Sequence, residues 1–265
     1  MSNYRLEGKT FVIDDYDRMP AFSSFLPGLA GVKGIPMWTF YTNRGQGMNS
    51  FGIGNKGNAI MEFNSANTAF ENTQVKGFRT FLKIDGQYYE PFFQYEDDAK
   101  RSIRMNKNSF KIIENNTKYG IEVTVNYYVL PNESIGALVR QVSVKNTGDK
   151  VKNIEIVDGL PKIITYGIAN GEFKEMSNLF KSWADIKNLE NKVPYYTLRA
   201  STKDSAEVSD VEGGYYYLTI KDNELQDVIY DVDTVYGYDL SLMKPVNFVE
   251  GGIDKVLAKK QCFAN

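Results

Sequence analysis

The chain has 265 residues, which is long enough for a large hydrophobic core, and we expect residues 1–265 to form a single domain. Its 31 Lys and Arg residues nearly balance its 33 Asp and Glu residues, so a net charge of -2 argues against a nucleic acid as partner. The chain contains no histidine, which excludes every Ser-His-Asp or Cys-His arrangement and most zinc sites.

The sequence also bears on the compartment. One cysteine, Cys262, excludes an internal disulfide and fits a reducing environment. The first residues lack the apolar core of a secretion signal, and no run approaches the roughly 18 apolar residues of a membrane span. We therefore expect a cytoplasmic protein with no membrane partner.

Most of the chain alternates apolar and polar residues with period two, and turn-forming clusters separate the runs. In chain order, we expect strands near residues 10–13, 38–42, 78–84, 110–113, 121–129, 138–144, 153–157, 196–200 and 215–220. The clearest run places one set of apolar residues on a single face: Ile121, Val123, Val125, Tyr127 and Val129. Many strands joined by short turns predict an all-β fold, a large antiparallel sandwich.

The stretch GIGNKG, residues 52–57, matches the G-x-G-x-x-G pattern of dinucleotide sites. Such a site needs a buried strand before the glycines and a helix after them. Here a half-polar stretch precedes the pattern, and the short run 58–64 follows it. Because Asn55-Lys56-Gly57-Asn58 is typical of a turn, we predict a β-hairpin and no cofactor.

One segment departs from period two. In GEFKEMSNLFKSWADIKNLEN, residues 171–191, the side chains of Phe173, Met176, Phe180 and Trp183 recur at helical spacing. This segment predicts one main accessory helix, with Trp183 in its buried stripe. The ending KVLAKKQCFAN predicts a further strand and gives no terminating signal, so we expect the full protein to continue beyond it.

The stretch NRGQG directly follows an aromatic strand, WTFY. Amide and guanidinium groups beside aromatic rings can bind a sugar, because they hydrogen-bond its hydroxyls while a ring stacks on its apolar face. Asn43, Arg44 and Gln46 are therefore candidate substrate-binding residues. The alternative is a loop at a strand end whose arginine pairs with a carboxylate.

Carboxylates gather at residues 14–17, 96–98 and 231–233, and we interpret these clusters as solvated turns. A glycosidase needs two carboxylates that face each other across a bond, and no pair in the sequence can be assigned that geometry. None of the clusters fits a calcium loop either. The sequence therefore predicts no catalytic residue and no metal ligand.

The stretch PAFSSFLPGLAGVKGIPMWTFYTNRGQGMNSFGIGNKGNAIMEFNSANTAFENTQVKGFRTFLK, residues 20–83, resembles the amino-terminal region of the cellobiose phosphorylase family, glycoside hydrolase family 94, formerly glycosyltransferase family 36. It is most similar to the branch that acts on β-1,2-linked oligoglucans. The segments EFKEMSNLFKSWADIKNLEN, LRASTKDSAEVSDVEGG and VYGYDLSLMKPVNFVEGG resemble the same branch, so the resemblance spans nearly the whole chain.

The resemblance implies a β-supersandwich related to the galactose mutarotase-like fold, which in full enzymes precedes a helical linker and an (α/α)6 barrel. Family members are inverting phosphorylases, in which phosphate attacks the anomeric carbon while an Asp of the barrel protonates the leaving oxygen. No barrel residue falls within the resemblance, so it implies no catalytic residue here.

The implied function is that of an accessory and dimerisation domain which contacts the β-glucan and is not catalytic alone. The implied partners are the oligosaccharide substrate, the barrel in the same chain and a second copy. A stand-alone carbohydrate-binding module is the alternative, and it needs an exposed aromatic platform. A mutarotase-like enzyme is disfavoured, because that chemistry uses histidine with a glutamate.

Overall fold

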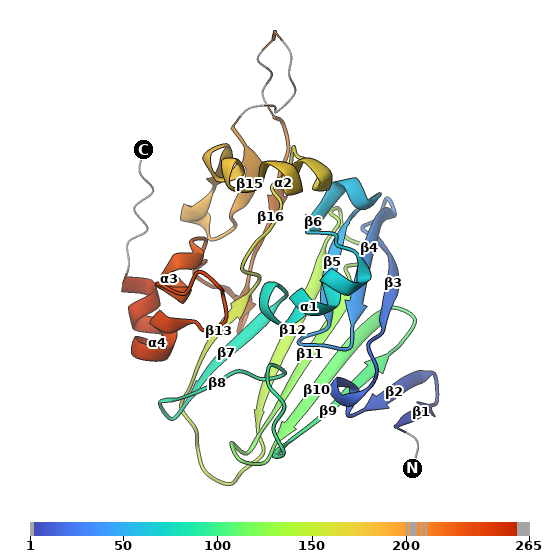
Figure 1. The fold of residues 1–265 in the computed structure, drawn as a ribbon, viewed down its shortest axis with the longest axis vertical. Helices are drawn as coiled ribbons and strands as arrows, with labels where there is room; N and C mark the ends of the chain where they lie inside the picture. Colours follow the sequence, from blue (N-terminus) through green and yellow to red (C-terminus); the bar gives the residue numbers. More distant parts are fainter. Residues whose placement is uncertain (1–2, 200, 202–205, 208, 210, 259–265) are drawn as a thin grey trace.

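The computed structural model describes the chain except for residues 1–2, 200, 202–205, 208, 210 and 259–265. Its largest sheet is antiparallel (Figure 1) and has the strand order β1 (Tyr4–Glu7), β2 (Thr10–Asp14), β9 (Ala99–Met105), β10 (Ser109–Asn116), β11 (Ile121–Val129) and β12 (Leu138–Asn146). A second sheet is a meander of β3 (Ser23–Ala30), β4 (Ile35–Thr42), β5 (Met48–Ile53) and β6 (Ala59–Met61).

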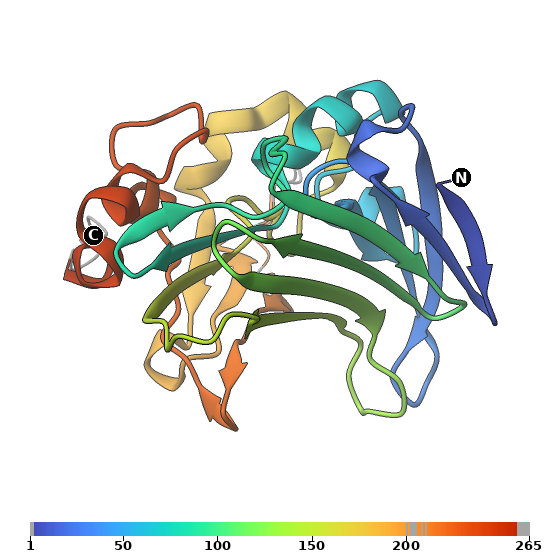
Figure 2. The ribbon, with the colours of Figure 1, turned by 90° about the horizontal axis from the view of Figure 1, so that it is seen from below.

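Three smaller sheets complete the β-structure. Two have three strands each, in the orders β13 (Ile154–Gly159), β7 (Arg79–Ile84), β8 (Gln87–Tyr89) and β14 (Ala184–Lys187), β15 (Tyr195–Leu198), β16 (Tyr215–Tyr216). The last is the hairpin of β17 (Ile220–Lys221) and β18 (Glu224–Leu225). Figure 2 shows the curved six-stranded sheet crossing the molecule, with α1 (Ala66–Lys76) on one side and the β17–β18 hairpin on the other.

The two largest sheets pack their apolar faces together. In β11 the residues predicted to share a face are buried, and Ile121, Val123, Val125 and Tyr127 are at most 1% exposed. They belong to one cluster with residues of β4 and β5, in which Tyr41 stacks on Phe110 with ring centres 4.3 Å apart. The structure therefore confirms the prediction of a β-rich, antiparallel fold.

The hairpin prediction for residues 52–57 is also confirmed. β5 pairs antiparallel with β6, and a single 3-10 turn, η2 (Lys56–Asn58), connects them. The Asn55 side-chain oxygen accepts a hydrogen bond from the Gly57 N–H at 2.8 Å. Gly52 lies so close to the returning strand that a Cβ atom there would be 2.2 Å from the Asn58 carbonyl oxygen.

The prediction of one long helix over residues 171–191 is wrong. The helix α2 (Asn170–Met176) is followed by a 3-10 segment, η3 (Ser177–Ser182), and then by β14 and a 3-10 turn, η4 (Leu189–Asn191). Phe173 and Phe180 are both buried and contact each other, so the apolar stripe is real. It ends there because β14 pairs with β15, which leaves Trp183 40% exposed and outside the core.

Three further helical segments have no counterpart in the prediction: α1, α3 (Val232–Tyr236) and α4 (Val246–Ala258). The strand predicted at the chain end is wrong for residues 255–258, which lie in α4. Cys262 and residue 200 lie outside the described residues, and the predicted strand 215–220 is divided between β16 and β17. No helix in the described part of the chain is long and apolar enough to cross a membrane.

Candidate functional site

The helix α1 separates two hollows of the surface. It follows β6, packs against β4 and β5, and leads into β7. Only Ala69 and Thr73 of the helix are buried, so most of its side chains face outward or line the hollows. The helix ends where the Gly77 N–H donates to the Thr73 carbonyl at 3.2 Å, and a Cβ at Gly77 would lie 2.3 Å from that oxygen.

The larger hollow, which we name the α1 groove, is shallow and lies between α1 and the segment before β3. Its volume is about 280 Å³. It is lined by Ala21, Phe22, Ser23, Ala66, Asn67, Phe70 and Glu71. Two aromatic rings together with small hydroxyl, amide and carboxylate groups make a surface that can take a sugar ring.

Asn43 is fully buried and holds one wall of the α1 groove in place. Its side-chain NH2 donates to the carbonyl oxygens of Tyr16 and Pro20 at 2.9 and 3.0 Å, and its oxygen accepts from the Phe22 N–H at 2.9 Å. The amide is thereby satisfied within the chain. Asn43 thus positions the wall of the groove and does not reach its surface.

Arg44 is half-buried beside the groove. Its guanidinium donates to the Asn43 and Met19 carbonyl oxygens at 2.7 and 3.2 Å and lies over the Phe70 ring, 4.5 Å from its centre. Burial lowers the pKa of the guanidinium, and the nearby Asp17 opposes this shift. No ion pair joins Arg44 to a described carboxylate, so the alternative of an ion-paired turn is wrong for these residues.

Gln46, the third predicted substrate-binding residue, is 3% exposed and therefore lies inside the fold. Its side-chain oxygen accepts hydrogen bonds from Arg140 and, at 3.3 Å, from the Thr80 hydroxyl. Arg140 also pairs with Asp158 at 2.5 Å. Gln46 therefore links the loop to a polar cluster between the strands, because its acceptor is used by groups of β7 and β12.

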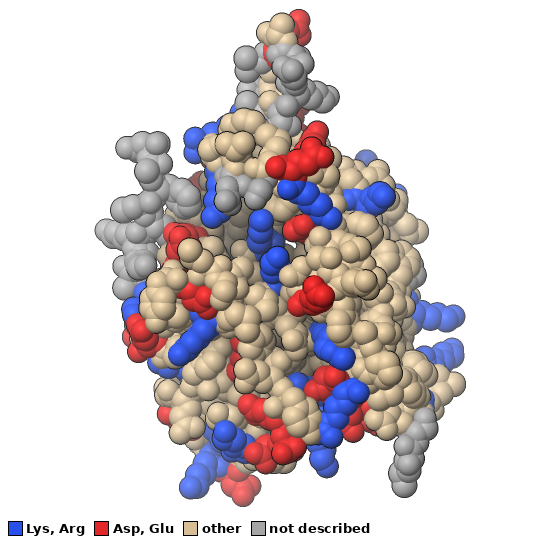
Figure 3. Space-filling view, viewed as in Figure 1, with Lys and Arg blue, Asp and Glu red and all other residues tan. Residues whose placement is uncertain are grey.

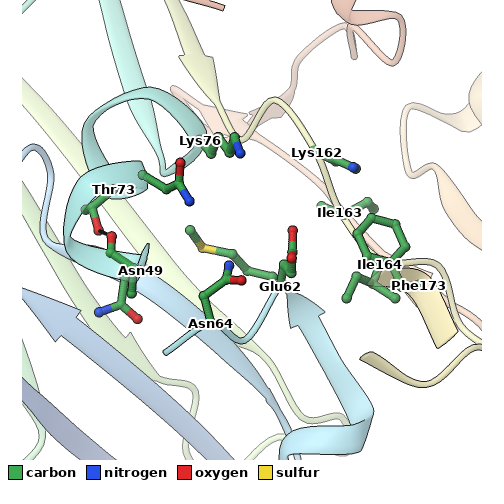
Figure 4. Close-up of a pocket in the computed structure, with 12 residues that line it drawn as sticks. Asn49, Glu62, Asn64, Thr73, Lys76, Lys162, Ile163, Ile164 and Phe173 are labelled. Atoms are coloured by element: carbon green, nitrogen blue, oxygen red, sulfur yellow. Dashed lines mark hydrogen bonds between the residues drawn. The ribbon is translucent and has the colours of Figure 1, made fainter. Parts of the chain in front are cut away.

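The smaller hollow, which we name the α1 cleft, lies on the other side of the helix. Figure 4 shows it enclosed by β5, the end of β6, α1, the connection before α2, and α2 itself. Both signs of charge surround a hollow above α1 in the space-filling view of Figure 3. The lining residues are Asn49, Met61, Glu62, Asn64, Ala69, Asn72, Thr73, Lys76, Lys162, Ile163, Ile164 and Phe173.

The cleft is small, and polar side chains line it together with apolar ones. Its volume is about 30 Å³. One water molecule needs roughly 10 to 15 Å³ on this scale, so the enclosed part holds about two water-sized groups. Thr73 donates its hydroxyl hydrogen to the Ala69 carbonyl at 2.6 Å. The side chains of Asn49, Glu62, Asn64, Asn72, Lys76 and Lys162 make no hydrogen bond or ion pair with another described residue.

Lys162 is the most perturbed group of the cleft. Its ammonium nitrogen lies 4.4 Å from the centre of the Phe173 ring. Partial burial lowers the pKa of this ammonium; Glu62 opposes the shift, while Lys76 and Lys181 add to it. A neighbouring negative charge would therefore stabilise the charged form of Lys162.

Three carboxylates elsewhere in the fold pair with buried arginines. The cluster at 14–17 is not simply a solvated turn, because Asp17 pairs with the buried Arg101 at 2.8 Å. Glu114 and Glu90 are buried against Arg101 and Arg79 at 2.7 and 2.6 Å. In the described part of the chain, no three Asp, Glu or Cys side chains gather to hold a metal ion.

Neither hollow was predicted from the sequence, because each is assembled from segments far apart in the chain. The cleft joins residues near 49, 62, 73 and 162, and no local pattern connects them. Two of the three predicted site residues contact residues that line the groove: Asn43 bonds to the Phe22 N–H, and Arg44 lies over the Phe70 ring. The Gln46 side chain bonds to residues that line neither hollow. Neither models of known protein families nor the sequences of curated proteins give a match to the chain.

Proposed function

We propose that this chain is the accessory β-sandwich domain of an inverting β-glucan phosphorylase of the cellobiose or β-1,2-oligoglucan type, with a galactose mutarotase-like fold. It contacts the glucan and does not catalyse its cleavage alone. Its partners are the oligosaccharide, a catalytic barrel in the same chain and a second copy. The resemblance described above and the antiparallel sandwich support this proposal.

The α1 groove is the observation that carries the carbohydrate part of the proposal. It has a volume of about 280 Å³, and the aromatic side chains of Phe22 and Phe70 are among the residues that line it. The Arg44 guanidinium rests on Phe70 and keeps that ring in a fixed orientation. Asn67 and Glu71 supply an amide and a carboxylate for the hydroxyls at the edge of the ring.

Two observations support the absence of catalysis by this domain alone. An inverting phosphorylase needs attacking phosphate and an acidic side chain beside the sugar, and the residues that line the α1 groove include one carboxylate, Glu71, and no lysine or arginine to hold phosphate. The cleft that holds Glu62 has no room for a sugar ring. The proposal therefore assigns bond cleavage to another part of the enzyme.

Exposed apolar side chains support docking to a partner. Tyr238 and Leu240, in the connection between α3 and α4, are 81% and 85% exposed, and Met243 follows at 47%. A contiguous segment of this kind is typical of a surface that another protein surface covers. We assign it to contact with the barrel or with the second copy.

Calorimetric titration with β-1,2-linked gluco-oligosaccharides tests the groove. Phe70→Ala should weaken binding roughly three- to tenfold, because an aromatic contact contributes about 0.5 to 1.5 kcal/mol. Phe25→Ala is the matched control, since Phe25 is an aromatic residue of β3, 45% exposed and outside the groove. Arg44→Ala removes the guanidinium from the Phe70 ring and should also weaken binding. Its control is Arg18→Ala, which removes a guanidinium from the ring of Tyr95.

Three results would contradict the proposal. The first is the absence of saturable binding, and the second is an equal loss of affinity in Phe70→Ala and Phe25→Ala. The third is release of sugar phosphate by the pure chain from a β-glucan and inorganic phosphate. Binding that depends on Trp183 or Tyr4 instead of Phe70 would favour the alternative of a stand-alone carbohydrate-binding module.

A further inference from the structure

The α1 cleft concentrates polar groups that have no partner in the described structure. Asn49 is 8% exposed and lines the cleft, and its amide makes no hydrogen bond to another described residue. The amide can therefore form hydrogen bonds with water or with a ligand in the cleft. Figure 4 shows Asn64, Lys76, Lys162 and Glu62 around one space.

The charge of the cleft favours an anion. Two ammonium groups, those of Lys76 and Lys162, share it with one carboxylate, that of Glu62, and none of the three forms an ion pair with another described residue. Lys181 adds a third positive charge near Lys162. Like charges held together are unfavourable, and an anion placed between Lys76 and Lys162 would relieve their repulsion.

The size of the cleft limits what can enter. An enclosed volume of about 30 Å³ accepts about two water-sized groups, so it can take two oxygens of a small tetrahedral anion. The remaining oxygens of such an anion, or the molecule that carries it, would stay at the mouth. The glucan proposed for the α1 groove therefore occupies a different place.

Glu62 selects among the anions. Its ionised carboxylate only accepts hydrogen bonds, so it repels an oxyanion that carries no proton. A hydrogen-phosphate group has one P–O–H donor for Glu62 and further oxygens for the lysines and for the NH2 groups of Asn64 and Asn72. Sulfate has no such donor.

We propose that the α1 cleft binds a hydrogen-phosphate group, either as free phosphate or as the monoester of a small molecule, between the ammonium groups of Lys76 and Lys162. Glu62 accepts the proton-bearing oxygen, and the amides of Asn49, Asn64 and Asn72 complete the set of hydrogen bonds. This inference does not depend on glucan binding in the groove.

Calorimetric titration of the whole chain at pH 6 tests the site, because near this pH phosphate monoesters keep one proton in about half of the molecules. We expect saturable binding of inorganic phosphate that is at least about tenfold tighter than binding of sulfate. Lys76→Met and Lys162→Met should each weaken phosphate binding at least about tenfold, since each removes a charge-assisted hydrogen bond. Lys145→Met is the control, since Lys145 is an exposed residue of β12, and this variant should bind phosphate as the unchanged protein does.

Glu62→Gln tests the selectivity separately. The amide offers a donor where the carboxylate offered an acceptor, so this variant should bind sulfate and phosphate within about threefold of each other. If a hexose phosphate binds more tightly than inorganic phosphate, the ligand of the cleft is a phosphate monoester. If inorganic phosphate binds equally well or more tightly, the ligand is the free anion.

The proposal is overturned if phosphate does not bind saturably, if both lysine variants bind it like Lys145→Met, or if wild-type protein binds sulfate as tightly as phosphate. Circular dichroism spectra of the variants establish that they fold, which the exposed positions of Lys76 and Lys162 and the half-buried position of Glu62 favour. Loss of glucan binding in Phe70→Ala with retained phosphate binding separates the two sites.

Discussion

Removal of the Glu114 carboxylate should strongly destabilise the sandwich. Glu114 lies on β10 with no exposed surface, accepts from the Arg101 Nε–H and the Phe92 N–H at 2.7 Å each, and accepts from the Tyr89 hydroxyl. Phe92 has a φ of 64°, which is unfavourable for a bulky residue. One carboxylate therefore neutralises a buried cation and fixes a strained turn.

The magnitude follows from these contacts. Breaking a buried ion pair by removing one partner costs about 3 to 5 kcal/mol. Arg101 keeps its contact with Asp17 at 2.8 Å, which places Glu114→Ala near the lower end, at about 3 kcal/mol. Glu114→Gln keeps an acceptor for Arg101 and Phe92 and can donate to Tyr89, so we expect a loss of about 1 to 2 kcal/mol.

Urea unfolding followed by circular dichroism measures these losses. Glu122→Ala, on the outer face of β11, is the surface control and should change the free energy of unfolding by less than about 0.5 kcal/mol. In thermal unfolding, Glu114→Ala should lower Tm by roughly 6 to 12 °C. A loss below about 1 kcal/mol for Glu114→Ala, or equal losses for Ala and Gln, would refute the reasoning.

Two further predictions concern α4 and the connection between α3 and α4. Gly252→Ala should lower the free energy of unfolding in urea by about 1 to 3 kcal/mol, because Gly252 has a φ of 65° at the kink of α4. The control is Gly171→Ala in α2, where an added Cβ meets open space, so this change should be neutral or stabilising. Equal effects of the two substitutions would contradict the prediction. Hydrogen bonds from Ser241 and from the Lys244 N–H lower the pKa of Asp239. The stability that Asp239 contributes is therefore present above its unfolded pKa and is lost as pH falls through the folded pKa, so Asp239→Ala should lower Tm at pH 7 but not at pH 2. A Tm difference independent of pH would contradict it.

Period-two alternation predicted the strands well where one face of a sheet is buried. In β11 every second residue from Ile121 to Tyr127 is in the core, and β10 pairs with it over its full length. Turn chemistry located the β5–β6 hairpin for a similar reason, since the Asn55 side chain closes the turn locally. Both signals depend on residues that are close in sequence.

Prediction failed where distant parts of the chain decide the local structure. Residues 184–187 continue a helical pattern, but pairing with β15 makes them a strand. The glycines in α4 interrupt its apolar periodicity, although Gly252 is required at the kink. The aromatic neighbours of NRGQG suggested a sugar-binding loop, whereas the side-chain oxygen of Gln46 accepts a hydrogen bond from Arg140, 94 residues away in sequence.

The helix α1 connects the failure of prediction with the candidate site. A helix that packs one face on a core carries an apolar stripe, and α1 has none, since only Ala69 and Thr73 are buried. Several of its other residues line the two hollows: Asn67 and Phe70 line the groove, and Asn72 and Lys76 line the cleft. The polar composition that hides this helix from sequence patterns thus agrees with its position between the two hollows, which we propose as binding surfaces. Local sequence rules are expected to fail at functional sites, because residues there serve a ligand as well as the fold.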